Sequence, residues 1–244
     1  MTVLQGPTLK RQVVILAGGL GTRLRPITEK MPKPMAPVMG EPFLHWQLKD
    51  LKRQGYQRVL LLTAYLGEQI EQHFGDGSKY GMQITYSREP SPLGTGGALR
   101  HALSKLENEF FLLNGDSFLM APLDQMALTF HKSTCSAMIS TYSHQPTHPP
   151  MPVIPNLECQ GGRVIRYEKD AGPEKGFHQI DSGVYLLKRS IVGSRPEGIF
   201  ALADLWPPLI AEGSLAAFGV DDRFYDIGTM DRLAEFESAI RAGF

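Results

Sequence analysis

Apolar runs and helical patterns alternate along the first half of the chain. Residues 13–17 form an uninterrupted apolar run, which predicts a buried strand, and residues 43–54 carry leucines at helical spacing before Gly55. The same patterns predict alternating strands and helices further on, at residues 58–63, 68–74, 82–87, 95–106 and 110–114. This alternation indicates an α/β fold with a doubly wound, mixed but mostly parallel sheet, whose ligands bind outside the carboxyl ends of the strands.

The second half of the chain is less regular. Strands are predicted at residues 136–142, 163–167, 180–187 and 215–220, and a closing helix at residues 230–241. Five prolines within residues 145–155 predict a loop or an edge excursion. We therefore expect a single domain over residues 1–244 that closes with residues 230–244, and no pattern of a left-handed β-helix follows residue 229.

A glycine-rich segment follows the first predicted strand directly. Gly18, Gly19 and Gly21 allow the backbone to approach a ligand, and backbone N–H groups in such a loop can bind phosphate. Arg23 adds a planar set of donors, and Lys33 adds a point charge between two stiffening prolines. A plain turn with solvated cations would explain each residue singly. Their combination predicts a phosphate-rich ligand over the end of this strand.

Two common phosphate-binding loops do not fit this segment. No Lys-Ser or Lys-Thr pair follows the glycines, which excludes the loop typical of nucleoside triphosphatases. The dinucleotide-binding fingerprint needs a helix that starts inside the glycine motif. Prolines interrupt the next stretch at Pro26, Pro32, Pro34 and Pro37, so a long helix is not expected there.

Two aspartates beside glycines follow predicted strands. Asp116 comes directly after Gly115, and Asp226 stands two residues before Gly228. A lone aspartate in this setting is usually a turn residue, but two carboxylates near phosphates suit Mg²⁺. Lys169 ends another predicted strand and is either a second phosphate-binding cation or a solvated surface lysine.

Composition and charge narrow the classes of partner. The chain has 25 Lys and Arg residues and 25 Asp and Glu residues, so its net charge gives no support to binding of nucleic acid or a membrane surface. No apolar stretch is long enough to span a bilayer, and residues 1–11 lack the apolar core of a signal peptide. Cys135 and Cys159 form no metal or redox motif. We expect a cytoplasmic protein with reduced cysteines, whose oligomeric state the sequence leaves open.

Taken together, these motifs resemble the signature of the sugar-1-phosphate nucleotidyltransferases. The first block covers residues 16–26 and 32–34, and later blocks match in the order of that family at residues 92–99, 114–116, 168–169, 181–185 and 226–229. The resemblance spans nearly the whole chain and implies the Rossmann-like sheet of the nucleotidyltransferase type. Within the family, the chain is most similar to D-glycero-D-manno-heptose 1-phosphate guanylyltransferases, followed by mannose-1-phosphate guanylyltransferases.

The resemblance also implies a role for each matched residue. Arg23 and Lys33 correspond to catalytic cations, and Asp116 and Asp226 to ligands of Mg²⁺. The positions expected to bind the nucleotide, within a half of about 12–135, are Leu16, Ala17, Gly18, Gly19, Gly21, Thr22, Glu89, Gly94 and Thr95. The positions expected to bind the sugar phosphate, mostly in a half of about 136–229, are Asn114, Glu168, Lys169 and Asp181. Two positions, Asp170 and Asp181, depart from the usual proline and asparagine of the family, and both lie on the sugar side.

The expected reaction transfers a nucleotidyl group from a nucleoside triphosphate to a sugar 1-phosphate and releases pyrophosphate. GTP is the expected donor, first because the resemblance to guanylyltransferases implies it. A second reason is that the carboxylate of Glu89 only accepts hydrogen bonds and so complements the N–H groups of guanine. Glu89 could instead be a surface acid paired with Arg88, with the base recognised by the backbone of Leu16, Ala17 or the Gly94 loop. Uridylyl or thymidylyl transfer also stays open.

Two rival functions differ from this prediction in class. A non-catalytic nucleotide-sugar sensor on the same fold should have lost Lys33 or one of the two acids, whereas this chain keeps them all. A glycosyltransferase that uses a nucleotide-sugar usually carries an Asp-x-Asp pair, but here Ser117 and Phe118 follow Asp116.

Overall fold

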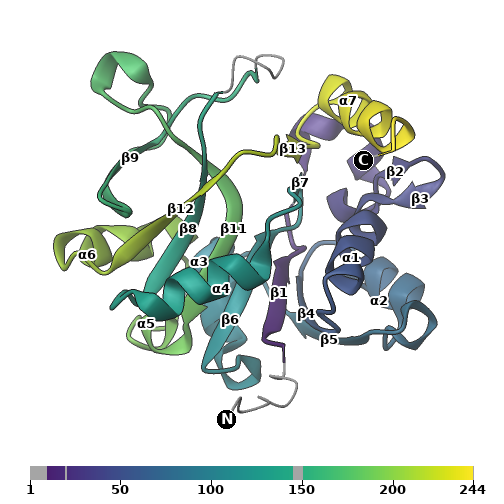
Figure 1. The fold of residues 1–244 in the computed structure, drawn as a ribbon. Helices are drawn as coiled ribbons and strands as arrows, with labels where there is room; N and C mark the ends of the chain where they lie inside the picture. Colours follow the sequence, from purple (N-terminus) through teal and green to yellow (C-terminus); the bar gives the residue numbers. More distant parts are fainter. Residues whose placement is uncertain (1–9, 20, 145–150, 244) are drawn as a thin grey trace, which may run out of the picture.

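A large mixed sheet forms the centre of the computed structural model, which describes residues 10–19, 21–144 and 151–243 (Figure 1). Within these residues the sheet has nine strands in the order β5-β4-β1-β6-β11-β8-β12-β10-β9. The strands are β1 (Gln12–Leu16), β4 (Arg58–Thr63), β5 (Gln83–Arg88), β6 (Glu109–Asn114), β8 (Ala137–Tyr142), β9 (Leu157–Gln160), β10 (Arg163–Tyr167), β11 (Ile180–Lys188) and β12 (Leu215–Val220). Every strand predicted from the sequence is present, and β9 is an addition.

Strand direction divides the sheet into a parallel and a mixed part. β5, β4, β1 and β6 are parallel neighbours, with Val13 of β1 between Val59 and Phe111. β11 runs antiparallel to both β6 and β8, β12 is parallel to β8, and β10 is antiparallel to β12 and β9. The prediction of a mixed sheet is confirmed, and parallel pairing predominates in the first half of the chain.

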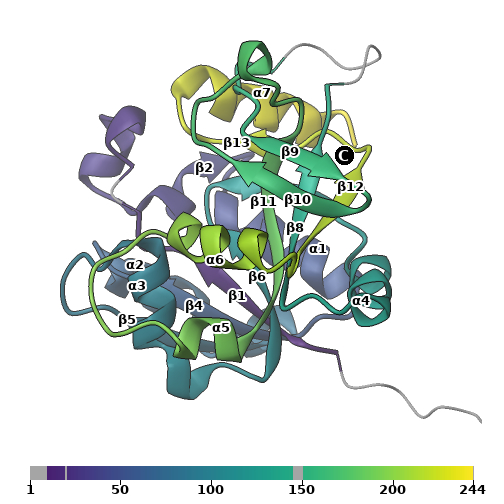
Figure 2. The same ribbon diagram turned by 90° about the vertical axis from the view of Figure 1, so that its left-hand side faces the viewer.

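Helices cover both faces of the sheet, as a doubly wound fold requires. Helices α1 (Phe43–Arg53), α2 (Gly67–Phe74) and α4 (Leu123–Lys132) pack on the face that carries Val13 and Ile15. Helices α3 (Gly94–His101), α5 (Arg189–Gly193) and α6 (Trp206–Ala211) pack on the face of Val14, and α5 and α6 lie in front of the sheet in Figure 2. Side chains alternate between these two cores because successive residues of a strand point to opposite faces.

A third, smaller core joins α7, near the C-terminal end of the described chain, to residues that follow β1. Helix α7 (Met230–Arg241) packs against the long loop after β1 and against the N-terminus of α1, as its position beside β2 (Pro37–Val38) and β3 (Glu41–Pro42) in Figure 1 shows. Phe236 of α7 contacts Phe43 and Phe118 at ring-centroid distances of 5.0 and 5.1 Å. The long loop is thereby held between α1 and α7, over the carboxyl ends of the parallel strands.

The structure corrects some of the predicted boundaries. The helix expected over residues 95–106 ends at His101 and is followed by a separate 3₁₀ turn, Leu103–Lys105. Residues 145–150 of the proline-rich stretch lie outside the described residues. After residue 229, the described chain forms α7. No helix in the described ranges is long and apolar enough to cross a membrane.

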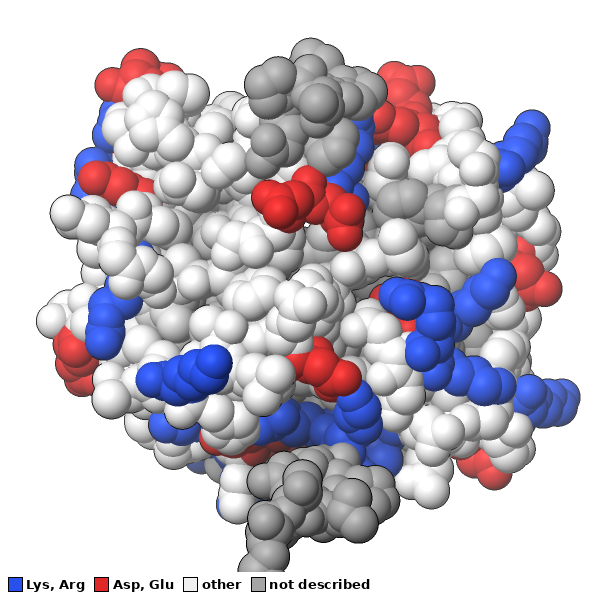
Figure 3. All heavy atoms as spheres, in the orientation of Figure 1, with Lys and Arg blue, Asp and Glu red and all other residues white. Residues whose placement is uncertain are grey.

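Both signs of charge occur on the surface. On the face drawn in Figure 3, Asp and Glu side chains lie among Lys and Arg side chains, and one group of basic side chains gathers over α1 and α2. This distribution agrees with the zero net charge of the chain.

Candidate functional site

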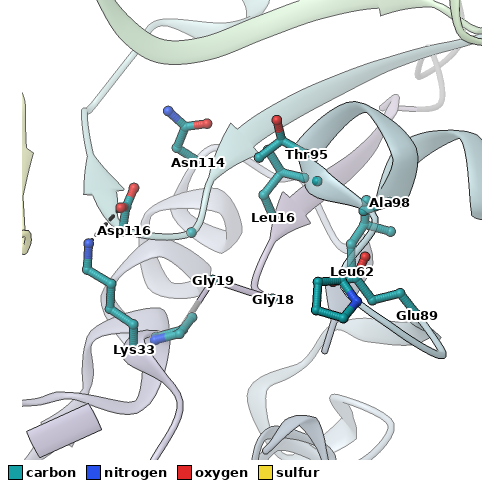
Figure 4. A pocket seen from close by; sticks show the side chains of 14 residues that line it. Leu16, Gly18, Gly19, Lys33, Leu62, Glu89, Thr95, Ala98, Asn114 and Asp116 are labelled. Atoms are coloured by element: carbon teal, nitrogen blue, oxygen red, sulfur yellow. Dashed lines mark hydrogen bonds and ion pairs between the residues drawn. The ribbon is translucent and has the colours of Figure 1, made fainter. Parts of the chain in front are cut away.

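A cavity of about 400 Å³ opens where the four parallel strands end (Figure 4). Leu16 and Asn114 are the last residues of β1 and β6, Leu62 lies near the end of β4, and Glu89 directly follows β5. The lining includes nine of the residues predicted for the site: Leu16, Gly18, Gly19, Lys33, Glu89, Gly94, Thr95, Asn114 and Asp116. The structure thus brings these nine residues together at the carboxyl edge of the sheet, and their roles in binding stay predictions.

Lys33 and Asp116 mark one end of this cavity. Lys33 begins a short 3₁₀ helix, Lys33–Met35, and its side chain is buried. Its Nζ lies 2.7 Å from Oδ2 of Asp116, and Figure 4 shows the two side chains pointing toward one another. A buried ammonium is tolerated because it is paired. Prolines 32 and 34 fix the backbone on both sides, so this cation has a defined position.

The glycine loop after β1 contains one position with space around it and one position that is tightly packed. A Cβ at Gly19 would meet nothing within 4 Å, so this part of the loop is open to a ligand. Gly21 has a φ of 63°, and a Cβ there would lie 2.8 Å from the Thr28 methyl group. The Thr28 hydroxyl donates to the Gly21 carbonyl at 2.8 Å. Gly21 and the following Thr22 shape the loop and do not line the cavity.

The backbone at the end of β1 is largely occupied by the sheet. The Ala17 N–H donates to the Leu62 carbonyl at 2.8 Å, and the Leu16 carbonyl accepts the Gly115 N–H at 3.1 Å. Ala17 is fully buried and lies outside the cavity lining. These groups hold β1 to its neighbours and are not available to a ligand.

The two predicted metal ligands are brought together by a small additional sheet. Strand β7 (Ser117–Phe118) pairs with β13 (Tyr225–Asp226), and the Ile227 N–H donates to the Asp116 carbonyl at 2.9 Å. Asp226 lies beside the cavity rather than in its lining. The described residues contain no cluster of three or more His, Cys, Asp or Glu suited to a metal. A pair of carboxylates nevertheless fits Mg²⁺, which takes one or two carboxylates and completes its shell with phosphate oxygens and water.

Arg23 stands apart from these pairs. Its side chain is exposed, and it has no hydrogen-bond or ion-pair partner among the residues that the structure describes. One guanidinium nitrogen would lie 3.7 Å from a Cβ placed on Gly228, next to Asp226. Within the described part of the chain, Arg23 is therefore an unpaired cation on the side of the cavity where Asp226 lies.

Glu89 lies at the opposite end, beyond Gly18 (Figure 4). Its Oε2 accepts the Leu93 N–H at 3.1 Å, and burial raises the pKa of this carboxyl. Leu16, Leu62 and Ala98 give the neighbouring wall an apolar surface. This end of the cavity combines a flat apolar wall with a hydrogen-bond acceptor.

Helix α3 begins at the cavity but is clamped from outside by residues 198–202. The Phe200 carbonyl accepts the N–H groups of Gly96 and Gly97 at 3.0 and 3.2 Å, and the Thr95 hydroxyl accepts the Leu202 N–H at 2.8 Å. A Cβ at Gly96 would overlap the Phe200 ring. No local pattern predicts this clamp, because its partners are about a hundred positions apart in the sequence.

On the sugar side, the structure brings only Asn114 to the cavity. Gly183 of β11, at a φ of 83°, leaves room for the Asn114 amide, which would lie 2.8 Å from a Cβ. Asp181 is tied inside the fold: its carboxyl accepts the Tyr185 hydroxyl at 2.9 Å and the Gly183 N–H at 3.0 Å. Burial raises the pKa of Asp181 to about 6.

The other two sugar-side residues lie away from the cavity lining. Glu168 forms an ion pair with Lys175 at 2.6 Å, and Lys169 is exposed. Neither is placed against Asn114 or Asp116 by any contact within the described ranges.

The sequence analysis did not predict two residues that hold the cavity loops in place, Gln47 and Gly115. Gln47 of α1 is buried, and its Nε2 donates to the carbonyls of Asn114 and Ser117 at 2.8 and 2.7 Å. A polar residue inside the apolar stripe of a predicted helix was the signal that could have revealed it. Gly115 was noted only as a neighbour of Asp116, yet a Cβ there would overlap the Leu16 carbonyl oxygen.

Comparison with known proteins agrees with this architecture. A model of the nucleotidyl transferase family matches residues 12–243. The chain therefore belongs to the nucleotidyl transferase family, whose members are enzymes. It is 34% identical to D-glycero-alpha-D-manno-heptose 1-phosphate guanylyltransferase of Campylobacter jejuni, over 92% of this chain and 98% of that protein.

Two further relatives extend the comparison. Mannose-1-phosphate guanylyltransferase of Mycobacterium tuberculosis is 36% identical over 88% of this chain, which spans only 60% of that longer protein. The crystal structure of HddC from Yersinia pseudotuberculosis in complex with GMP-PN has a TM-score of 0.79 and 28% identity. That match covers 95% of this chain and the whole of the other.

Proposed function

We propose that this chain is a guanylyltransferase that transfers GMP from GTP to a sugar 1-phosphate. The observation that carries the proposal is the cavity itself, with an acceptor carboxylate at its apolar end and a lysine–aspartate pair at the other. The two relatives named above as guanylyltransferases for manno-configured sugars support it.

The chemistry requires charge neutralisation more than proton transfer. An oxygen of the sugar 1-phosphate attacks the α-phosphorus of GTP, a new P–O bond forms, and the bond to the β-phosphate breaks to release pyrophosphate. A phosphate monoester has its second pKa at about 6 and is largely a dianion at neutral pH, so it needs no general base. The cavity lining, as far as the described residues show it, contains no histidine, and this mechanism needs none.

Protein cations offset the repulsion between the two anionic substrates. Lys33 lies at the end of the cavity where the phosphates would meet, and Arg23 is free to bind the leaving pyrophosphate. Such preorganised charges stabilise the transition state because they need no reorganisation during the reaction. Asp116 and Asp226 would hold Mg²⁺, which would supply further positive charge to the phosphates.

Guanine fits the Glu89 end better than uracil or thymine. The carboxylate has one oxygen that is not bound to the Leu93 N–H, and it can only accept hydrogen bonds. Guanine presents adjacent N–H donors to this carboxylate. The carbonyl oxygens of uracil are acceptors and cannot form a hydrogen bond with it. The backbone alternative is weakened, because Gly96 and Gly97 already donate to Phe200.

The acceptor that we propose is D-glycero-D-manno-heptose 1-phosphate, with mannose 1-phosphate as its closest competitor. The support for heptose is the relative from Campylobacter jejuni, whose length this chain matches almost fully.

Steady-state kinetics would test the donor. We expect kcat/KM for GTP to exceed the values for UTP, dTTP, CTP and ATP with one fixed acceptor. Glu89→Gln replaces one acceptor oxygen by a donor and should reduce the preference for GTP over UTP by about tenfold. A preference for UTP or dTTP in the unchanged enzyme would contradict guanylyl transfer. An unchanged preference in the Glu89→Gln variant would assign base recognition to the backbone.

A further inference from the structure

Arg232, in the first turn of α7, makes an unusual contact with Asp226. One of its nitrogens, Nη1, donates to both carboxylate oxygens at 2.9 Å each. A donor at equal distance from both oxygens fills the notch between them. A cation that binds a carboxylate through both oxygens at once needs this same notch. Oδ1 also accepts the Gly228 N–H at 2.8 Å, so Oδ2 is the less occupied oxygen among the described contacts.

The guanidinium of Arg232 is anchored by more than the carboxylate. Its Nη2 donates to the Pro152 carbonyl at 2.8 Å, and the Thr229 hydroxyl accepts the Arg232 N–H at 3.4 Å. The next residues of α7 that face inward, Leu233 and Phe236, are buried in the third core. These contacts keep Arg232 in the notch, because withdrawal would break its hydrogen bonds to the Pro152 carbonyl and to both carboxylate oxygens of Asp226.

The cations near the cavity therefore differ in what they can do. Lys33 binds a single oxygen of Asp116, Oδ2. The other oxygen of Asp116 accepts the Ser117 hydroxyl at 3.3 Å, its one hydrogen-bond partner within the described ranges. Arg23 has no partner in the described part of the chain and is available to a phosphate. Both terminal nitrogens of Arg232 donate hydrogen bonds to the protein, to Asp226 and to Pro152. Arg232 is therefore suited to positioning the Asp226 carboxylate rather than to binding a substrate.

We propose that Arg232 restricts Asp226 to binding a divalent cation through one oxygen and thereby favours Mg²⁺ over Ca²⁺. The inference rests on the proposed role of Asp226 as a magnesium ligand. Mg²⁺ demands a compact octahedral shell and keeps several waters, so single carboxylate oxygens satisfy it. Ca²⁺ takes six to eight oxygens and often uses both oxygens of a carboxylate. When Arg232 fills the notch, Ca²⁺ cannot bind both oxygens of Asp226 at once. Binding of Mg²⁺ through a single oxygen is not affected.

A purely structural role is the alternative. In that case Arg232 would only tie α7 to β13 and to Pro152, and its loss would lower stability without changing the choice of metal. The relative affinity for the two ions therefore separates the two roles, because a change in folding alone moves both affinities together.

Titration calorimetry on the full chain with a non-hydrolysable GTP analogue provides this measurement. Mg²⁺ and Ca²⁺ are titrated separately into the unchanged protein and into Arg232→Met, which keeps the length of the side chain but removes the charge and the fork. We expect the ratio of Mg²⁺ affinity to Ca²⁺ affinity to fall by about tenfold, mainly because Ca²⁺ binds more tightly. Arg241→Met is the matched control, since Arg241 lies on the same helix, is exposed and pairs with Glu237.

Two more variants keep the outcomes distinct. Arg232→Lys retains a cation that reaches the notch of the Asp226 carboxylate but not the Pro152 carbonyl. It should lower the ratio of Mg²⁺ affinity to Ca²⁺ affinity by less than Arg232→Met does. If Arg232→Met does not fold, the result for Arg232→Lys decides between the two roles of Arg232. An unchanged ratio in both Arg232 variants overturns the inference. Asp226→Asn tests the underlying role: if Mg²⁺ affinity is unchanged there, the proposed metal function of Asp226 is itself wrong.

Discussion

At the scale of single residues, the site depends on charges held in fixed positions by their neighbours. Lys33 is buried between two prolines and paired with Asp116, while Arg23 is left without a partner among the described residues. Two cationic side chains, Lys33 and Arg23, thus differ in their surroundings, and we expect them to differ in function. Substitutions at such positions should change catalysis and stability separately.

Replacing Lys33 by alanine should reduce turnover strongly and leave the fold intact. Among the residues that the structure describes, Lys33 is the one Lys or Arg that lines the cavity, and loss of one such donor at a reacting centre typically costs about a hundredfold in kcat. Lys33→Arg should restore activity only in part, because a planar guanidinium does not match a point charge. Lys30→Ala, at an exposed position of the same loop, is the control. Near-normal kcat in Lys33→Ala would remove this residue from the mechanism.

The buried carboxyl of Asp181 should make stability depend on pH. Burial raises its pKa from 3.8 to about 6 in the folded protein. As pH rises through this window, the unfolded chain loses the proton first, so the free energy of unfolding falls and stays lower above the folded pKa.

Asp181→Asn should remove this penalty. Relative to the unchanged protein, the variant should gain about 2–3 kcal/mol between roughly pH 4 and pH 7.5, less the hydrogen bond that the amide nitrogen cannot accept. Denaturant unfolding at several pH values measures the difference. A constant offset at every pH would show that the Asp181 carboxyl does not titrate between the two states.

At the scale of elements, the cavity exists because β1 and β6 end at the same edge and their loops approach closely. The Gly115 N–H donates to the Leu16 carbonyl, and Gln47 of α1 holds the carbonyls on either side of Asp116. Residues 198–202 clamp the start of α3 from the opposite half of the chain. The loops are therefore fixed by contacts between elements rather than by their own sequences alone.

Gly115→Ala should damage this edge, because a Cβ there overlaps the Leu16 carbonyl oxygen. We expect a loss of about 1–3 kcal/mol in the free energy of unfolding, typical of overpacking, together with weaker GTP binding. Gly19→Ala is the matched substitution, since its Cβ would meet no atom within 4 Å. It should keep normal stability and affect only ligand binding. Equal stability of the two variants in urea unfolding would contradict this account of the strand ends.

How far the sequence predicts each element depends on whether its signal is local. β1, β4 and β6 are continuous apolar runs, and α1 has a clear helical stripe, so all were predicted. Helix α6 was missed because Pro207 and Pro208 lie in its first turn, where proline is tolerated but the pattern suggests a loop. The Phe200 clamp could not be predicted, because its partners are about a hundred positions apart and meet only through tertiary packing. The Arg232–Asp226 contact joins residues that are close in sequence, but it depends on how α7 is oriented against β13, which no local pattern indicates.

At the scale of the whole molecule, two halves with different strand directions meet beside the cavity. β11 runs antiparallel next to β6, so the second half of the chain reaches Asn114 through Gly183. Helix α7 then returns to the loop after β1, and β13 sets Asp226 beside Asp116. The proposed site therefore draws on residues from both halves of the chain and on the closing helix.

The most direct test of the central claim follows the α-phosphorus of GTP. GTP labelled at this position is mixed with D-glycero-D-manno-heptose 1-phosphate, Mg²⁺ and the enzyme, and the products are separated. The account predicts that the label enters a GDP-sugar while unlabelled pyrophosphate forms in equal amount, and that omission of the sugar phosphate stops both. Binding of GTP without pyrophosphate release with any sugar 1-phosphate would contradict it, and would instead indicate a nucleotide-binding protein without transferase activity.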